Sequence, residues 1–299
     1  MRGIIIPAVT PFGPDGAILV DRLQANIARW ARSGVAGYMV LGTNGEARSL
    51  DDSESLDVIV AAAAANQGKT LIAGVGRESL VSTLRFIDQV AARQVRLDYV
   101  SVLTPSYFAK AMTDTALIGY YQAVADASPY PVWLYCAPAY ANSVAISPAA
   151  LTVLADHPNI GGIKDTSGSS MGDYLAAVGR RDDFTVLAGS ITNLAACLAG
   201  GGAGGVCSVA NYLPASCARI VELWDTDQAA ALDLLAELRT LSAATSAAHG
   251  VAGVKACMNL LDYAGTVPRL PVLPVPARTA AGWADKLRTW RGLAWEPGA

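Results

Sequence analysis

Short apolar runs alternate with longer amphipathic stretches along almost the whole chain. The short runs are rich in Ile, Val and Leu and lack the polar alternation of half-exposed strands, whereas apolar residues recur at helical spacing between them. This order predicts parallel βα units, not a β-sandwich or a helical bundle. The predicted strands cover residues 3–8, 37–41, 70–75, 99–103, 132–135, 160–164, 185–188 and 205–209.

Eight strands with crossover helices favour one α/β fold, a closed (β/α)8 TIM barrel with additional C-terminal helices. The pattern Asp51-Asp52-Ser53-Glu54 indicates a capped helix start. We expect the barrel over residues 1–225 and a C-terminal helical region, packed on it, over residues 226–299. The helices between strands are predicted at residues 20–33, 51–65, 80–92, 113–127, 147–155 and 191–199, and the later ones at 215–224, 227–248, 253–263 and 280–290.

Composition narrows the class of partner. The 299 residues are 53% hydrophobic and 16% charged, with a formal net charge of -3, so the chain carries no basic footprint for nucleic acid. Two long uncharged runs, at residues 127–155 and 184–218, are interrupted by prolines or glycines and do not predict membrane spans. Five cysteines without a C-x-x-C pair indicate buried free thiols and a cytoplasmic protein. Small molecules are the expected ligands.

One lysine stands out by its position. Lys164 ends the predicted strand at residues 160–164, and reactive groups of such barrels come from the C-terminal ends of strands. Burial there favours the neutral amine, which is the nucleophile that forms an imine with a carbonyl substrate. The other four lysines are expected on loops or helices with hydrated ammonium groups: Lys69, Lys110, Lys255 and Lys286.

A tyrosine and a glycine-rich turn complete the candidate chemistry. Tyr135 ends the neighbouring predicted strand and is a candidate proton shuttle, although a strand tyrosine is more often a packed residue with one hydrogen bond. The turn Gly42-Thr43-Asn44-Gly45-Glu46 follows the second strand. Consecutive backbone N–H groups of such a turn can form an anion nest, although a plain structural loop is the commoner case. A 2-oxo acid would suit an amine beside an anion nest.

Four motifs in the same order and spacing resemble the dihydrodipicolinate synthase and N-acetylneuraminate lyase family. The resemblance covers roughly residues 3–275 and implies class I aldolase chemistry on pyruvate by a barrel enzyme that assembles as a dimer of dimers. The motifs are Gly42-Thr43-Asn44-Gly45-Glu46, Thr104-Pro105-Ser106-Tyr107, Leu134-Tyr135-Cys136-Ala137-Pro138 and Gly162-Ile163-Lys164-Asp165.

The resemblance assigns roles to matching positions. Lys164 resembles the Schiff-base lysine and Tyr135 the proton shuttle. Thr43 resembles the hydroxyl relay, and its backbone N–H, with that of Asn44, would bind the pyruvate carboxylate. Tyr107 resembles the tyrosine that reaches in from the neighbouring subunit. The imine itself supplies the electron sink, so we expect neither a metal nor an organic cofactor.

Two departures bear on the substrate. Where this chain has Asn44, the synthases have a second threonine. Where it has Tyr140, they have an arginine that pairs with the carboxylate of the aldehyde substrate. The form seen here is closer to 4-hydroxy-2-oxoglutarate aldolases, in which Thr166 would match a pocket-lining serine. The resemblance through Gly204-Gly205-Val206-Cys207 adds Cys207 to the expected substrate-binding residues.

We therefore expect a class I aldolase that cleaves 4-hydroxy-2-oxoglutarate or a 2-keto-3-deoxy sugar acid to pyruvate and an aldehyde. Arg77, after the third strand, is a candidate partner for a distal carboxylate, whereas neutral Tyr140 and Asn142 would suit a sugar acid. The alternatives are a dihydrodipicolinate synthase, which condenses pyruvate with aspartate semialdehyde, and a non-catalytic 2-oxo acid binding protein.

Overall fold

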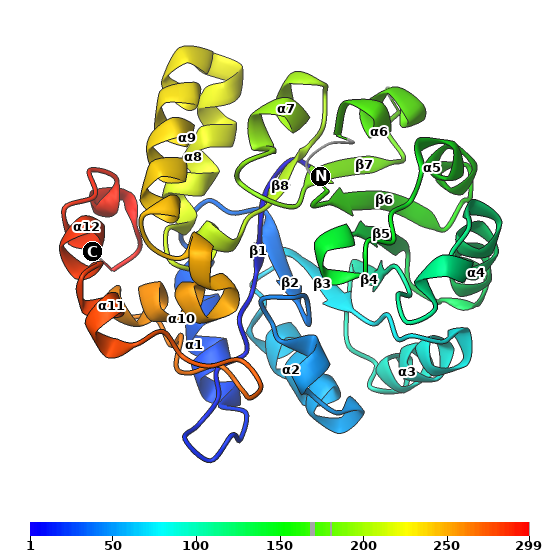
Figure 1. Ribbon diagram of the computed structural model, residues 1–299, viewed down its shortest axis with the longest axis horizontal. Helices are drawn as coiled ribbons and strands as arrows, with labels where there is room; N and C mark the ends of the chain where they lie inside the picture. The colour runs from blue at the N-terminus through cyan, green and yellow to red at the C-terminus, as the bar shows by residue number, and fades with distance from the viewer. Residues whose placement is uncertain (168–170, 180, 299) are drawn as a thin grey trace. The chain divides into compact units, whose positions relative to one another are not determined.

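The computed structural model describes residues 1–167, 171–179 and 181–298. Eight strands close into a barrel in chain order, which confirms the predicted (β/α)8 fold (Figure 1). The strands are β1 (Gly3–Pro7), β2 (Gly37–Val40), β3 (Thr70–Gly74), β4 (Tyr99–Leu103), β5 (Val132–Cys136), β6 (Ile160–Asp165), β7 (Thr185–Ala188) and β8 (Gly204–Val206).

A helix follows each strand, and further helices follow the last. The helices are α1 (Val20–Trp30), α2 (Asp52–Ala65), α3 (Leu80–Ala92), α4 (Asp114–Ala127), α5 (Pro148–Ala155), α6 (Met171–Val178), α7 (Leu194–Ala199), α8 (Pro214–Thr226), α9 (Gln228–Ala243), α10 (Gly250–Leu260), α11 (Ala277–Ala281) and α12 (Ala284–Arg288). Of these, α6 was not among the predicted helices. The predicted cap of α2 is confirmed, because Asp51 and Glu54 each accept the other's backbone N–H, at 2.8 and 3.1 Å.

Several predicted elements shift by a few residues at their ends, and two differ more. β8 stops at Val206, and a short 3-10 helix at Ser208–Asn211 takes the place of its predicted second half. The reason is Asn211, whose buried amide accepts a hydrogen bond from Val9 N and donates one to Pro7 O, at 3.1 and 2.9 Å. The helix predicted over residues 280–290 is two short helices, since the chain turns between α11 and α12 at Gly282, a poor helix former.

Contacts between residues group the chain into two compact units, one of Met1–Arg2 with Ile72–Val206 and one of Gly3–Leu71 with Cys207–Ala299. The predicted division into residues 1–225 and 226–299 stays a prediction. Among the described residues, no helix has the length and apolar character needed to cross a bilayer. All five cysteines are free and buried, as predicted.

In the first unit, α3 to α7 pack side by side in chain order outside the strands (Figure 1). Strands β5 and β6 pair in parallel, and Tyr135 lies opposite Lys164. A glycine makes this part of the sheet possible: a Cβ on Gly162 would lie 2.9 Å from the indole nitrogen of Trp133 and 2.5 Å from the carbonyl oxygen of Thr185. The missing side chain therefore lets the Trp133 ring pack at the base of β6, beside Tyr99 at 4.9 Å between ring centroids.

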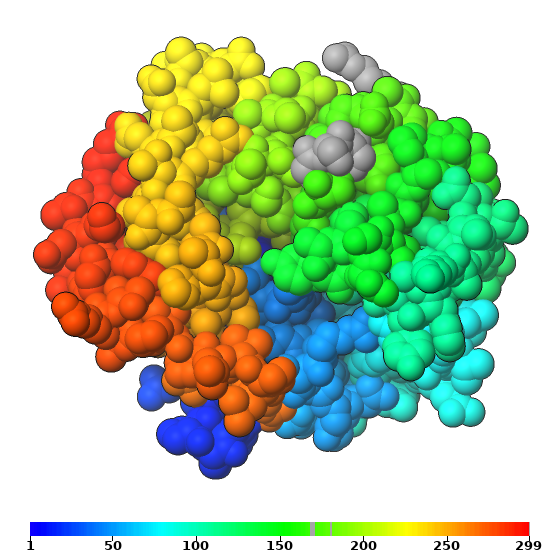
Figure 2. Space-filling view, in the orientation of Figure 1, coloured from blue at the N-terminus to red at the C-terminus, as the bar shows by residue number. Residues whose placement is uncertain are grey.

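In the second unit, α8 and α9 lie side by side, and the C-terminal segment, red in Figure 2, packs against α8. Buried Glu296 accepts the backbone N–H groups of Ala215 and Ser216 at 2.9 and 2.8 Å. These N–H groups belong to the first turn of α8 and have no partner within the helix, so the carboxylate caps it. Burial raises the pKa of Glu296 above its ordinary range.

Candidate active site

Lys164 and Tyr135 lie together at the C-terminal ends of β6 and β5. Their side chains are 4% and 5% exposed, and Lys164 Nζ lies 3.9 Å from the centroid of the Tyr135 ring. The two residues are partners in the β5–β6 register, so backbone pairing fixes their neighbourhood. A lysine ammonium over the electron-rich face of a tyrosine ring is a favourable contact. The structure thus brings together the two residues that the sequence predicts to carry the chemistry.

Beyond Lys164, the backbone of β6 is anchored on both sides. The buried Asp165 accepts the backbone N–H of Ser167 at 2.9 Å, and its carbonyl accepts that of Gly189 at 2.6 Å. Thr166 donates both its backbone N–H and its hydroxyl to the carbonyl of Cys136, at 2.9 and 3.1 Å. The Thr166 hydroxyl is therefore oriented by the end of β5. The predicted contact of Thr166 with substrate stays a prediction.

Tyr107 follows β4 in a turn held by a carboxylate that the sequence reasoning missed. Glu78 accepts the backbone N–H groups of Ser106 and Tyr107 at 2.8 and 3.0 Å and the Ser106 hydroxyl at 3.1 Å. Tyr107 itself is 77% exposed and meets Phe108 edge-on at 5.0 Å between ring centroids. The only sequence signal for Glu78 is its place directly after Arg77, beyond the end of β3.

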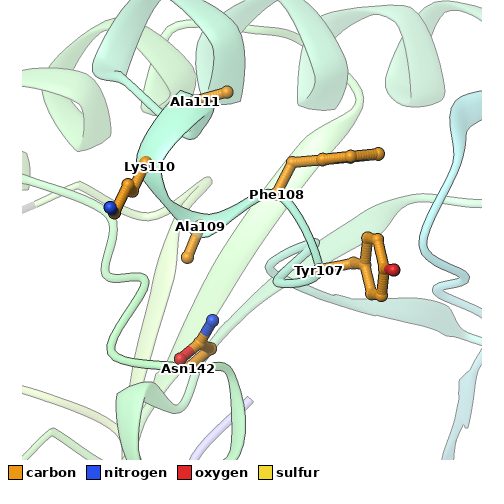
Figure 3. A pocket seen from close by; sticks show the side chains of 6 residues that line it. All are labelled: Tyr107, Phe108, Ala109, Lys110, Ala111 and Asn142. Atoms are coloured by element: carbon orange, nitrogen blue, oxygen red, sulfur yellow. The ribbon is translucent and has the colours of Figure 1, made fainter.

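A surface hollow of about 370 Å³ lies beside this turn (Figure 3). In Figure 3 the Tyr107 ring points away from Asn142. Asn142 has a left-handed backbone, with φ 47°, and donates its side-chain N–H to Ser106 O at 3.4 Å. Tyr140, predicted at the distal end of the substrate, is 61% exposed and lies in a short 3-10 helix at Pro138–Tyr140. The hollow is lined by Tyr107, Phe108, Ala109, Lys110, Ala111 and Asn142.

Arg77 folds back onto its own surroundings. Its guanidinium lies 3.8 Å from the centroid of the Phe86 ring and donates to the carbonyls of Val75 and Gly76, both at 3.3 Å. Its backbone N–H donates to the Thr83 hydroxyl at 2.9 Å. The side chain thus has protein partners in this conformation, and its role toward a distal carboxylate stays a prediction.

In the second unit, the turn of residues 42–46 follows β2. Leu41, directly before the turn, and Glu46, its last residue, have left-handed backbone, with φ 56° and 53°. Glu46 N–H donates to Thr43 O at 3.1 Å, which closes the turn. The Asn44 amide donates to the Ser208 hydroxyl at 2.7 Å, just beyond β8. Non-glycine residues in this conformation are uncommon and concentrate at functional sites.

The same turn rests on a buried ion pair that the sequence did not predict. Lys255 Nζ lies 2.6 Å from Glu46 Oε1, and both side chains are almost fully buried. The expectation of a hydrated ammonium at Lys255 is therefore wrong: α10 packs this residue into the interior at 0% exposure. Cys207, also predicted at the site, is buried in the same unit, and its carbonyl accepts the N–H of Ala210 at 3.0 Å.

The fold and the site define the class of this protein as a (β/α)8 barrel with a buried lysine and tyrosine side by side at the C-terminal ends of neighbouring strands. Comparison with known proteins narrows this class. The profile of the Dihydrodipicolinate synthetase family matches residues 1–288. The chain belongs to this family, whose members are lyases and aldolases, and it is an enzyme. This excludes the non-catalytic binding protein among the alternatives.

The named relatives include both an aldolase and a synthase. A probable mitochondrial 4-hydroxy-2-oxoglutarate aldolase of Emericella nidulans is 32% identical over 286 residues, 93% of this chain and 91% of its own. A 4-hydroxy-tetrahydrodipicolinate synthase of Xanthomonas axonopodis pv. citri is 33% identical over 287 residues, 93% and 90% of the two chains. Among solved structures, the prophage protein YagE of E. coli K12 in complex with pyruvate matches with a TM-score of 0.87 at 27% identity, over 96% and 98% of the chains.

Proposed function

We propose that this enzyme is a class I aldolase that forms an imine between Lys164 and the C2 carbonyl of a 2-oxo acid and releases pyruvate. The observation that carries the proposal is the pairing of Lys164 with Tyr135, at 3.9 Å from Nζ to the ring centroid. The pair joins a potential nucleophile to a potential proton carrier. The likeness to YagE, which was solved with pyruvate, supports this ligand.

The proposed reaction has four steps. The neutral amine of Lys164 attacks C2, and loss of water gives a protonated imine. The C3–C4 bond then breaks as the C4 hydroxyl loses its proton, and the bonding electrons move toward the iminium, which leaves an aldehyde and an enamine. Tyr135 carries that proton, and C3 is protonated in turn. Water finally hydrolyses the imine, which frees pyruvate and restores the amine.

The turn of residues 42–46 is our candidate for binding the carboxylate of the 2-oxo acid. We assign this role to the backbone N–H groups of Thr43 and Asn44, since consecutive amides in a turn form an anion nest. The Thr43 hydroxyl is assigned to the proton relay. The left-handed backbone of Leu41, directly before the turn, and of Glu46, its last residue, supports a functional role for this loop.

We further propose that the enzyme is a homo-oligomer, a dimer of dimers, in which Tyr107 completes the relay of a neighbouring copy. The support is a pair of exposed aromatic side chains in contact, Tyr107 and Phe108, which are 77% and 69% exposed; Tyr140, in the same unit, is 61% exposed. Exposed apolar side chains that cluster in this way mark interaction surfaces. The five buried free thiols support a reducing compartment such as the cytoplasm.

For the substrate we propose 4-hydroxy-2-oxoglutarate or a 2-keto-3-deoxy sugar acid. Tyr140 argues against the synthase, because the resemblance places at this position the arginine that pairs with the carboxylate of aspartate semialdehyde, and Tyr140 carries no positive charge. Arg77, Thr166 and Cys207 are the other proposed substrate contacts. Dihydrodipicolinate synthesis is the second candidate and is supported by the relative from Xanthomonas.

The test is reductive trapping. Incubation with pyruvate and borohydride should leave a stable adduct, and peptide mapping should place it on Lys164. Lys255, the other buried lysine, lies on a separate peptide and serves as the internal control. An unmodified Lys164 would contradict the proposal. Cleavage of 4-hydroxy-2-oxoglutarate should be faster than condensation of pyruvate with aspartate semialdehyde, and the reverse order would favour the synthase.

A further inference from the structure

Lys255 forms an ion pair with Glu46, the last residue of the turn of residues 42–46. Lys255 Nζ forms an ion pair with Glu46 Oε1 at 2.6 Å and donates hydrogen bonds to Thr10 O at 2.8 Å and Val267 O at 2.9 Å. An ammonium has three N–H donors; the two carbonyls accept two of them, and the charge lies against the carboxylate. Lys255 is therefore placed to hold structure in position and is not placed to attack a substrate.

Two routes connect Lys255 to the turn. The first is direct, through the Glu46 carboxylate, whose second oxygen accepts the backbone N–H of Arg269 at 2.8 Å. The second runs through Thr10, whose carbonyl accepts from Lys255 and whose hydroxyl donates to Gly45 O at 2.7 Å. Adjacent residues of the turn, Gly45 and Glu46, are thereby held from one ammonium.

The surroundings keep this arrangement rigid. The Phe12 ring has Lys255 Nζ at 4.3 Å and the Arg269 guanidinium at 4.5 Å from its centroid. Arg269 is in turn fixed to Glu54 by two hydrogen bonds, at 2.8 and 2.6 Å, and donates to the carbonyl of Ser49 at 2.7 Å. Lys255 and Arg269 therefore each have partners other than the Glu46 carboxylate.

Stability alone gives a weak reason for such a pair, since burying two charges costs much of what their attraction returns. Geometry gives a stronger one. Glu46 has a left-handed backbone, and its N–H closes the turn on Thr43 O. A carboxylate clamped at two oxygens fixes that residue, and with it the direction of the amides of Thr43 and Asn44.

We propose that Lys255 and Glu46 are positioning residues, which hold the Thr43 and Asn44 amides in the conformation that binds the carboxylate of the 2-oxo acid. This inference rests on the proposed function. Lys255 acts through Glu46 and Thr10 and touches no reacting atom. Disrupting the pair should weaken substrate binding while leaving imine chemistry at Lys164 available.

The experiment is borohydride trapping titrated with pyruvate, together with steady-state kinetics, on Glu46→Gln and Lys255→Met. The amide side chain introduced by Glu46→Gln still offers an oxygen to the Arg269 N–H but lacks the charge that holds Lys255. We expect the half-saturating pyruvate concentration and KM to rise roughly tenfold or more, the loss expected when a charge-assisted hydrogen bond is misaligned. At saturation the adduct on Lys164 should still form, and kcat should fall by less than KM rises.

Glu54→Gln is the matched control, because it removes a charge from the same cluster without touching the Lys255–Glu46 pair. Its half-saturation should stay within about twofold of the wild type, a change too small to reflect a lost hydrogen bond. Circular dichroism melts establish that each variant folds, and Glu46→Asp, which keeps the charge, should recover part of the lost affinity.

Three results would overturn the inference: unchanged half-saturation in both folded variants, a fall in kcat with unchanged KM, or loss of the fold in both variants, which would make the pair a purely structural element. A wild-type protein that gives no adduct would instead refute the proposed function. The two failures are therefore distinguishable.

Discussion

Lys164 and Lys255 are both buried lysines, yet their surroundings differ in kind. Lys164 is the second-last residue of β6, and its amine lies over the ring of Tyr135. Lys255 lies in a helix, and its amine has a carboxylate and two carbonyls as partners. Burial alone thus does not mark a lysine as a nucleophile. The groups around the amine decide whether it can attack a carbonyl or only hold a neighbouring segment in place.

The electrostatics of Lys255 follow from this setting. Burial lowers the pKa of Lys255, because the interior disfavours the charged form, and the Glu46 carboxylate partly opposes this effect. The pair therefore depends on both partners: removing one leaves the other charged and buried without compensation. The following predictions separate the two lysines, beginning with the largest effect.

Lys164→Met should abolish turnover, with a loss of kcat on the order of 10⁴-fold or more, because the covalent route disappears. Lys255→Met should keep most of its kcat. Steady-state cleavage of 4-hydroxy-2-oxoglutarate by the two variants, measured at saturating substrate, makes the comparison. Similar losses in both variants would erase the distinction between a catalytic and a positioning lysine.

For the free energy of unfolding, we expect Lys255→Met to have a larger effect than Lys164→Met. Lys255→Met should lower the free energy of unfolding by about 3–5 kcal/mol, because Glu46 is left buried without a counter-charge. The double variant Glu46→Gln/Lys255→Met should lose less than the sum of the two single variants. Urea denaturation of the four proteins measures this coupling, and strict additivity would show that the two side chains act independently.

The smallest effect concerns the Glu54–Arg269 pair at the edge of the same cluster. The hydrogen bond from Arg269 holds the pKa of Glu54 below its ordinary value of 4.5, so its stabilisation is fully present above that pH and is lost as pH falls through the lowered pKa. Glu54→Gln, which can still cap α2, should cost roughly 0.5 kcal/mol at neutral pH. The difference in unfolding free energy from wild type should shrink below about pH 4.5. A difference that is constant from pH 7 to 3 would contradict this assignment.

Much of the barrel could be predicted from local patterns. The predicted strands at residues 99–103 and 185–188 match β4 and β7, and the predicted helix at residues 80–92 matches α3. These elements could be predicted because the spacing of apolar residues within a short stretch of sequence distinguishes strands from helices. The end of β8 could not be predicted in this way. Asn211 bends the chain there through bonds to Val9 and Pro7, which are distant in sequence.

Some residues of the candidate site could likewise be predicted from local sequence, and others could not. Lys164 and Tyr135 were predictable because each ends a predicted apolar strand, and parallel pairing of β5 and β6 then brings them into register. Glu78 and Lys255 were not, since a carboxylate in a loop and a lysine on a helix are by themselves typical of solvated surface groups. Only the tertiary structure shows that Glu78 contacts the turn after β4 and that Lys255 contacts the turn of residues 42–46.

The sequence by itself determined the succession of strands and helices, the barrel class and the lysine at the end of β6. Tertiary structure decided which charges are buried and what they support: the carboxylate of Glu46 meets the backbone of Arg269 across 223 positions, and the Asn44 amide meets Ser208 across 164. The physical reason is that hydrophobic periodicity is a local property, whereas pairing a buried charge requires partners that only the closed fold brings within hydrogen-bond distance.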